Sequence, residues 1–235
     1  MHAKVNVVQN LQQVRKNIAA ACRRVGRNPQ EVGLVAVTKS VDPERMNQAL
    51  AAGVDVFGES RVQELVSKQP EFPGVRWHFI GYLQRNKVKY LPGRVELVHS
   101  LNRWSLAREL DRRAREHGQV FRVLVQVNIT RERGRFGVMP GEVAEFIRET
   151  AGLQGLQVEG LMTMAPFVAD PEQVRPLFRE MRDLFTRLGR EPGIRMWYLS
   201  MGMSNDYPVA VEEGANLVRV GTAIFGPRKC TLRGG

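Results

Sequence analysis

The chain has 235 residues, of which 43% are hydrophobic and 25% charged, and this is the composition of an ordinary globular protein and the length of one undivided α/β domain. No apolar run approaches the ~18 residues that a membrane-spanning helix needs, and the segment after Met1 lacks the apolar core of a signal peptide. The two cysteines, Cys22 and Cys230, do not form the Cys-x-x-Cys spacing typical of redox and metal motifs. We therefore expect a cytoplasmic protein without a membrane segment.

The net charge of +11 raises the hypothesis of nucleic-acid binding. However, arginines alternate with acidic residues over Arg108–Glu116 and again over Arg175–Arg187. Mixed charge at helical spacing is typical of a solvated helix face. The sequence also lacks a basic stripe interleaved with aromatic residues and a helix-turn-helix pattern. We expect no nucleic-acid partner.

In chain order, an amphipathic helix is predicted first, at Val7–Val25. After it, short runs rich in Val, Ile and Leu alternate with amphipathic stretches about twice as long, a pattern typical of βα units around a parallel sheet. The eight predicted strands are Val32–Thr38, Val54–Phe57, Val75–Ile80, Val95–His99, Arg122–Asn128, Leu156–Met162, Met196–Ser200 and Leu217–Val220. Eight such units favour a closed (β/α)8 barrel of the TIM type, an α/β fold, over an open doubly wound sheet. We expect a single domain over residues 1–235, with a frayed tail at 229–235.

Several residue pairs mark where the predicted helices begin and end. Asp42-Pro43 and Asp170-Pro171 each place a side-chain acceptor before a proline at the first helical position. Ser60–Gln63 has the pattern of a capping box. Gly53 and Gly118 stand where helices should end, because glycine tolerates a positive φ.

Lys39 is the first candidate functional residue. Functional groups of parallel barrels gather at the C-terminal ends of the strands, and Thr38-Lys39-Ser40 directly follows the first predicted strand. Partial desolvation at such a position would lower the pKa of the lysine amine and make it a competent Schiff-base former. The plain alternative is a surface lysine in a βα loop.

The loops after strands seven and eight contain glycines and hydroxyl groups. After strand seven, Ser200 and Ser204 supply hydroxyls, Gly202 permits close backbone approach, and Ser204 is a predicted N-cap that would leave free N–H groups above it. After strand eight, Gly221-Thr222 offers a second glycine and hydroxyl. One Gly/Ser loop is usually only a turn. Two of them, in the loops where barrels hold phosphate and opposite a lysine, indicate a phosphorylated ligand.

Six segments, in order along residues 5–228, resemble the pyridoxal phosphate homeostasis protein family. They are Val35–Lys39, Phe57–Ser60, Trp77–Gly81, Leu161–Met164, Leu199–Ser204 and Arg219–Gly226, of which the Ser-Met-Gly-Met-Ser run is the most specific. The family is itself similar to the barrel domain of bacterial alanine racemase, without that enzyme's second, β-rich domain.

The resemblance implies a binding site for pyridoxal 5′-phosphate. It implies that Lys39 forms the Schiff base with the cofactor and that Arg219 faces the pyridine nitrogen. The residues that it places around the phosphate are Ser200, Met201, Gly202, Ser204, Gly221 and Thr222. His78 and Met162 are weaker candidates for contacts near the ring. Ser60 stands where the family usually has Asn, and Arg135 where it often has Lys, so contacts that depend on those side chains are in doubt.

Three functions from different classes remain possible: a cofactor carrier, an enzyme and a docking surface for a partner protein. An arginine at the pyridine nitrogen disfavours its protonation, which weakens the ring as an electron sink. Tyr82 is the nearest candidate for a second catalytic base, and a packing role at the barrel rim explains it equally well. We therefore favour a monomeric binding protein that carries pyridoxal phosphate and regulates its supply to apoenzymes that depend on it. The alternative is an enzyme acting on an amino acid, such as a weak racemase, and the third hypothesis is a basic surface that docks an acidic partner protein.

Overall fold

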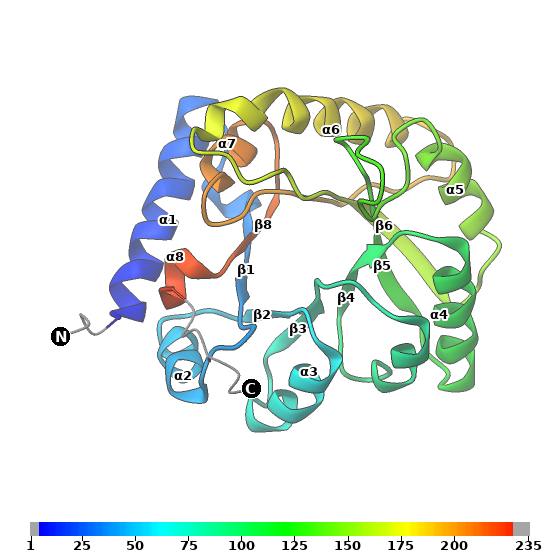
Figure 1. Ribbon diagram of the computed structural model, residues 1–235, viewed down its shortest axis with the longest axis horizontal. Helices are drawn as coiled ribbons and strands as arrows, with labels where there is room; N and C mark the ends of the chain where they lie inside the picture. The colour runs from blue at the N-terminus through cyan, green and yellow to red at the C-terminus, as the bar shows by residue number, and fades with distance from the viewer. Residues whose placement is uncertain (1–4, 228–235) are drawn as a thin grey trace.

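The computed structural model describes residues 5–227 and contains a closed barrel of eight parallel strands in the order β1 to β8 (Figure 1). The strands are β1 Gly33–Val37, β2 Val56–Glu59, β3 Arg76–Phe79, β4 Leu97–Leu101, β5 Phe121–Gln126, β6 Leu156–Met162, β7 Tyr198–Ser200 and β8 Leu217–Val220. All eight predicted strands and the (β/α)8 fold are confirmed, with strand ends within two residues of the prediction. The predicted frayed tail, 229–235, lies outside the described residues.

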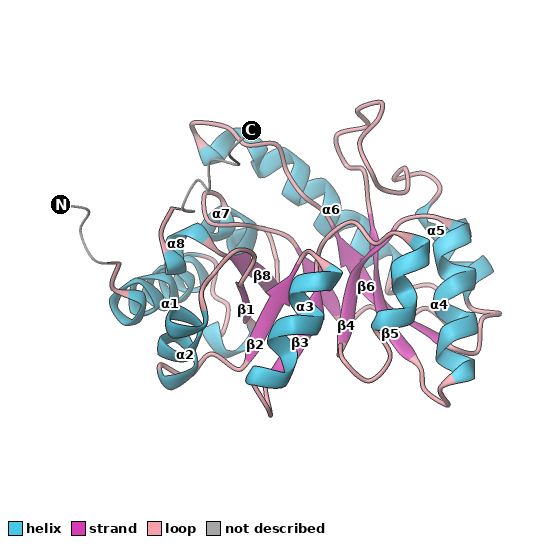
Figure 2. Cartoon of the chain, turned by 60° about the horizontal axis from the view of Figure 1, so that its bottom comes forward, coloured by secondary structure: helices cyan, strands magenta, loops and turns pink. Residues whose placement is uncertain are grey.

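Helices surround the barrel on its outside (Figures 1 and 2). The α-helices are α1 Val7–Arg24, α2 Pro43–Ala51, α3 Val62–Lys68, α4 Trp104–Glu116, α5 Val143–Thr150, α6 Arg175–Leu188, α7 Tyr207–Glu212 and α8 Thr222–Phe225. Short 3-10 helices lie at Pro29–Glu31, Gln69–Glu71, Arg85–Tyr90 and Pro171–Val174. None of the helices within residues 5–227 has the length and hydropathy needed to cross a bilayer.

The predicted N-terminal helix is confirmed as α1, which lies against α7 and α8 on the outside of the barrel (Figure 1). Its buried face has the three- and four-residue spacing of an amphipathic helix and consists of Val7, Leu11, Val14, Ile18, Ala21 and Cys22. Asn10 Nδ2 donates to the Ile224 carbonyl at 3.0 Å, and Asn17 Nδ2 donates to the Tyr207 hydroxyl at 2.8 Å. Helix α1 is therefore attached to both short helices that follow the last two strands.

Acidic side chains pair with the arginines of both arginine-rich helices, from within the helix on α4 and mostly from neighbouring segments on α6. On α4, Arg112 contacts Glu109 and Glu116, each at 2.6 Å. On α6, Arg175 contacts Glu172 at 2.6 Å and Glu213 at 3.0 Å. The exposed pairs among these add less than about 1 kcal/mol each to stability, whereas Glu213 is buried. Their larger effect is to reduce the local positive potential of these faces.

Four of the five predicted helix boundaries are confirmed by their hydrogen bonds or φ values, and one is wrong. Asp42 caps α2 by accepting from the Arg45 N–H at 3.0 Å, and Asp170 accepts from the Glu172 N–H at 3.0 Å. Gly53 and Gly118 have positive φ, at +80° and +61°. The capping box at Ser60 is wrong, because α3 begins at Val62 with no side-chain cap. The Ser60 N–H donates instead to the preceding carboxylate, Glu59 Oε2, at 3.1 Å.

The barrel interior is filled by side chains from alternate strand positions. Its apolar part consists of Val35, Val56, Leu97, Leu124, Met162 and Leu217, with Tyr198 against them. On β4, β7 and β8, the next inward-facing residue along the strand is polar. These residues are His99, Ser200 and Arg219, and all three are buried. The interior is thus an apolar plug joined to a buried polar cluster.

Strand pairing places the two predicted halves of the site side by side. Strand β1 pairs with β8 to close the barrel, with Val35 opposite Arg219 and Ala36 opposite Val220. Lys39 follows β1 and Gly221 follows β8, so closure brings both to the same part of the C-terminal rim. A Cβ on Gly221 would lie 3.2 Å from Val37 Cβ.

Gly202 lets the chain after β7 pass close to α7. Its φ is +93°, a left-handed conformation that favours glycine. A Cβ at this position would lie 2.6 Å from Ala210 Cβ and 2.9 Å from Tyr207 Cα. This glycine is therefore required by backbone packing in the described structure.

We predict that Gly202→Ala destabilises the protein more than Gly26→Ala does. Gly26 also has a positive φ, +70°, but a Cβ there would meet no atom within 4 Å. Gly26→Ala should cost about 1 kcal/mol through left-handed strain alone. Gly202→Ala should cost about 2 kcal/mol more because it also overpacks the α7 contact. Urea denaturation measures both, and equal losses would show that the α7 contact imposes no constraint.

Candidate functional site

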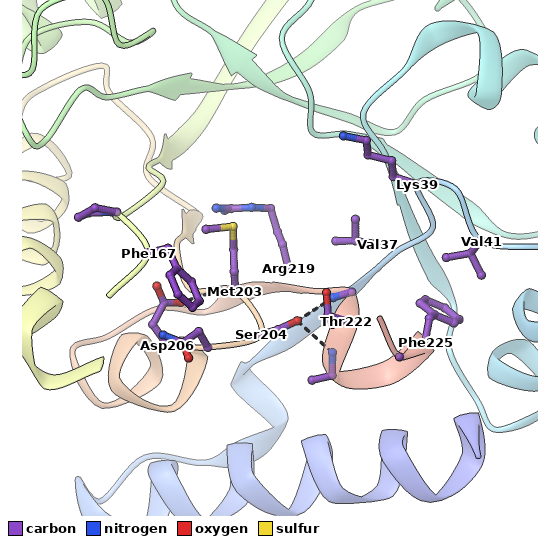
Figure 3. A pocket seen from close by; sticks show the side chains of 15 residues that line it. Val37, Lys39, Val41, Phe167, Met203, Ser204, Asp206, Arg219, Thr222 and Phe225 are labelled. Atoms are coloured by element: carbon purple, nitrogen blue, oxygen red, sulfur yellow. Dashed lines mark hydrogen bonds between the residues drawn. The ribbon is translucent and has the colours of Figure 1, made fainter. Parts of the chain in front are cut away.

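A cavity of about 560 Å³ opens at the C-terminal ends of β1 and β8, under the loops that follow β6 and β7 (Figure 3). Its lining residues are Val37, Lys39, Val41, Pro166, Phe167, Met203, Ser204, Asn205, Asp206, Arg219, Gly221, Thr222, Ala223, Phe225 and Gly226. Five residues predicted from sequence are among them: Lys39, Ser204, Arg219, Gly221 and Thr222.

Lys39 supplies the amine of this cavity. It is half-buried and follows β1, with Val37 and Val41 on either side of it along the lining (Figure 3). Within residues 5–227 its ammonium group makes no hydrogen bond or ion pair. An amine without a partner, at the edge of a cavity, is available to a ligand.

Ser204 joins the two loops that were predicted to hold phosphate. Its Oγ accepts from the Gly221 N–H at 3.2 Å and from the Ala223 N–H at 3.1 Å (Figure 3). The prediction that Ser204 caps its own helix is therefore wrong, since α7 begins only at Tyr207, after Asp206. The hydroxyl instead caps the neighbouring helix α8, which strand pairing brings within reach.

Backbone donors remain free around Ser204. The N–H groups of Ser204, Asn205 and Thr222 have no hydrogen-bond partner within residues 5–227, and all three residues line the cavity. Clustered backbone donors of this kind form anion-binding concavities. The chemistry of this side of the cavity therefore suits a phosphate dianion.

Asp206 fixes the shape of the loop that carries these donors. Its Oδ1 accepts from the Met203 N–H at 2.6 Å, and the side chain is buried. Burial raises the pKa of this carboxyl, although the backbone hydrogen bond from Met203 and the charge of Arg219 act in the opposite direction. Asp206 therefore closes the turn before α7.

Arg219 brings a buried cation to the cavity. The residue is 4% exposed, and its guanidinium donates to Ser200 Oγ at 2.5 Å and to the Thr163 carbonyl at 2.8 Å. Burial lowers the pKa of Arg219 to about 10, so the group keeps its charge at neutral pH. A cation held by two neutral acceptors has a fixed orientation, and the Asp206 carboxyl offsets part of its charge without forming an ion pair among the described residues.

Six residues predicted for the site do not line the cavity: Ser60, His78, Met162, Ser200, Met201 and Gly202. Ser200 turns inward to Arg219, and Met162 belongs to the apolar plug of the barrel. Met201 is fully buried in the outer core, while His78 faces a different cavity. The Ser60 hydroxyl is buried without a hydrogen-bond partner among the described residues. Their place in a ligand site remains a prediction.

Sequence reasoning missed several lining residues, of which Phe167 is the most exposed, at 86%. Figure 3 shows its ring beside Met203 and Asp206. The available signal was its position in the loop that follows predicted strand six. Tyr82 does not line the cavity. It stacks on Phe136 with ring centroids 4.1 Å apart, as expected for packing at the rim.

Comparison with known proteins gives consistent results. Residues 9–229 match the family described as alanine racemase, N-terminal domain. The chain is 44% identical over 227 residues to the pyridoxal phosphate homeostasis protein of Aquifex aeolicus, covering 96% of this chain and 100% of that protein. It is 38% identical to the Escherichia coli K12 protein of the same name, covering 95% and 97% of the two chains. This chain belongs to the pyridoxal phosphate homeostasis protein family.

A solved structure supports the same relationship. PipY of Synechococcus elongatus, in a structure with pyridoxal phosphate bound, is 34% identical and superposes with a TM-score of 0.81. The superposition covers 94% of this chain and 100% of PipY.

In this member of the pyridoxal phosphate homeostasis protein family, a cluster from α3 holds the backbone on both sides of Lys39. Lys68 Nζ donates to the Thr38 carbonyl at 2.7 Å, and the Ser40 N–H donates to Glu64 Oε2 at 2.8 Å. Ser40 has φ +58°, which costs about 1–2 kcal/mol for a residue other than glycine. These hydrogen bonds stabilise the strained turn and thereby fix the position from which the Lys39 side chain starts.

Glu59 is the buried member of this cluster and is fully inaccessible to solvent. Its Oε1 accepts from Lys68 Nζ at 2.7 Å and from Thr38 Oγ1 at 2.9 Å, and Lys68 also contacts Glu64 at 2.9 Å. Burial raises the pKa of Glu59, and Lys68 opposes that shift. The i,i+4 spacing of Glu64 and Lys68 on α3 can be read from the sequence, but the buried partner of Lys68 at the end of β2 cannot.

We predict that Lys68→Met destabilises the protein by about 3 kcal/mol at pH 7, because it leaves the Glu59 carboxylate buried without a counter-charge. In the variant, the folded-state pKa of Glu59 lies above its unfolded value, so the folded state binds more protons and regains stability as the pH falls. Urea denaturation at pH 7 and pH 5 should therefore show a smaller loss at pH 5.

Lys16→Met, at an exposed position on α1, is the control and should change stability by less than about 0.5 kcal/mol. If Lys68→Met were no worse than this control, or lost as much at pH 5 as at pH 7, the cluster would not depend on the Glu59–Lys68 pair.

Proposed function

We propose that this protein binds pyridoxal 5′-phosphate in the cavity beside Lys39 and regulates its supply, as a monomer that passes the cofactor to apoenzymes. The observation that carries the proposal is one cavity that combines an unpartnered amine, a buried cation and a set of free backbone donors. The family membership and the structure of PipY with pyridoxal phosphate bound support the same ligand.

The phosphate would lie against the loops after β7 and β8. Ser204, Asn205 and Thr222 supply the free N–H groups there, and the Thr222 hydroxyl is a further donor. Gly221 leaves space for a ligand in the cavity, because a side chain at this position would fill the space next to Val37. Backbone donors in fixed loops hold a dianion with little loss of conformational entropy.

Lys39 would hold the aldehyde as a Schiff base. The unprotonated amine attacks the aldehyde carbon, a C=N bond forms, and the carbonyl oxygen leaves as water, so the link is reversible by hydrolysis. The fixed backbone on both sides of Lys39 sets where the amine starts, and the four-carbon side chain covers the remaining distance. Reversibility suits a protein that must release what it holds.

Arg219 would lie at the pyridine nitrogen, as the family resemblance implies. Its charge opposes protonation of that nitrogen, which makes bound cofactor a weaker electron sink. Within residues 5–227, Lys39 and Asp206 are the ionisable residues that line the cavity besides Arg219, and Asp206 is engaged by the Met203 N–H. This set favours the carrier function over the alternative, a weak racemase, which would need a base on each face of its substrate.

We predict that Lys39→Ala abolishes covalent trapping of the cofactor by borohydride, because the reducible C=N bond cannot form. Mass spectrometry of peptides from wild type should place the modification on Lys39. Non-covalent binding through the phosphate loops should survive in part. Lys16→Ala is the control and should label as wild type does. Undiminished labelling of Lys39→Ala would contradict the assignment of the Schiff-base residue.

We predict that the protein exchanges the α-proton of amino acids no more than about tenfold faster than free pyridoxal phosphate, within the range of simple general-base assistance. The measurement is deuterium incorporation in D₂O over a panel of D- and L-amino acids, with Lys39→Ala as the control. Lys39-dependent exchange at ordinary enzymatic rates, near ~1 s⁻¹ or above, would establish the enzyme function instead.

A further inference from the structure

Four buried polar side chains form a continuous hydrogen-bonded chain through the barrel. Arg219 Nη1 lies 2.5 Å from Ser200 Oγ, which lies 3.1 Å from His99 Nδ1. His99 Nε2 lies 3.1 Å from His78 Nδ1. Each of the four residues is at most 4% exposed. The chain crosses from β8 through β7 and β4 to β3.

The two ends of this chain open on different cavities. Arg219 lines the cavity that also contains Lys39. His78 lines a second cavity, of about 540 Å³, at the N-terminal ends of the strands, together with Arg76, Glu96 and Tyr198. The chain thus joins the two ends of the barrel through the interior.

Counting hydrogens gives the chain a direction. A guanidinium only donates, so the Ser200 oxygen accepts from Arg219, and the Ser200 hydroxyl hydrogen is left for His99 Nδ1. Burial holds the pKa of His78 at about 3 and that of His99 well below its usual value, so both rings are neutral. Neutral His99, accepting at Nδ1, carries its hydrogen on Nε2 and donates it to His78 Nδ1. His78 then carries its hydrogen on Nε2.

The opposite direction is disfavoured by the surroundings of Ser200. If His99 donated from Nδ1, Ser200 would accept twice and its own hydrogen would need another acceptor. Within residues 5–227, Ser200 Oγ has no hydrogen-bond partners other than Arg219 and His99. A buried hydroxyl hydrogen would then remain unpaired, which is unfavourable.

We propose that Ser200, His99 and His78 are positioning residues for Arg219, joined in a one-way donor chain that runs from its guanidinium to the cavity at the opposite end of the barrel. The chain fixes the guanidinium in the orientation that it presents to the ligand cavity. It is a property of the protein alone, and it goes beyond the proposed function because it does not require that any cofactor bind.

The first test is the tautomer of each histidine in ligand-free protein, read from ¹H–¹⁵N long-range correlation spectra of imidazole-labelled protein at pH 8. We expect His78 and His99 both to carry hydrogen on Nε2. His117 is an internal reference of the opposite kind, since its Nδ1 lies 2.9 Å from the Arg113 carbonyl and must donate to it. Hydrogen on Nδ1 of His78 or His99, or a charged ring on either, would overturn the proposed direction.

The second test is the exchange with water of the Arg219 guanidinium hydrogens, measured by ¹⁵N-resolved NMR without cofactor. Ser200→Ala removes the acceptor, so exchange should accelerate by about tenfold or more. His99→Gln retains a side chain that both accepts and donates, and it should stay close to wild type, whereas His99→Leu should behave like Ser200→Ala. Unchanged exchange in both Ser200→Ala and His99→Leu would overturn the positioning role. Loss of cofactor binding with these results intact would count against the proposed function only.

Discussion

The structure depends on one buried cation that has no carboxylate partner. Within residues 5–227, Arg219 forms no ion pair, and its guanidinium is held by a hydroxyl and a carbonyl oxygen. Taking such a charge out of water is costly, and a neutral shell returns only part of that cost. The remaining positive charge acts in the cavity that Arg219 shares with the free N–H groups of Ser204 and Thr222. A cavity with this electrostatic character selects an anionic, planar acceptor of hydrogen bonds more strongly than it selects any particular reaction.

The position of Lys39 combines a rigid backbone with a free side chain. The carbonyl before it and the N–H after it are both bonded to residues of α3, and the strained turn at Ser40 is maintained by those bonds. The amine itself makes no hydrogen bond or ion pair within the described part of the chain. A protein that carries a ligand covalently needs both properties. The rigid backbone keeps the attachment point in one place, and the free side chain lets the bond to the ligand form and break without rearranging the fold.

Features that depend on local sequence patterns could be predicted, whereas features that depend on contacts between distant segments of the chain could not. The strands, helix α1 and the location of Lys39 rest on local patterns of apolar residues, and these were predictable. The hydrogen-bond partners of the Ser204 hydroxyl were not, and neither was the burial of the Ser60 hydroxyl without a partner among the described residues, because both depend on packing between distant segments. Ser204 caps α8, from the next βα unit, and this depends on how β7 and β8 pair. Likewise, alternation predicts that Ser200 and Met201 point to opposite faces, but only the closed barrel shows that Ser200 meets His99 from β4.

The pairing of β1 with β8 also has a consequence during synthesis of the protein. Gly33 pairs with Leu217, and α1 packs on α7 and α8, from which most of the described chain separates it. Contacts between such distant segments form late, because the chain between them must be ordered first. A nascent chain that has been synthesised only as far as β8 lacks Arg219 and the loop of Gly221 and Thr222, and it also lacks α8, one of the helices that cover α1. The Lys39 cavity and the full cover of α1 are therefore completed by the same segment, β8 with α8, and until that segment folds part of α1 is accessible to other proteins.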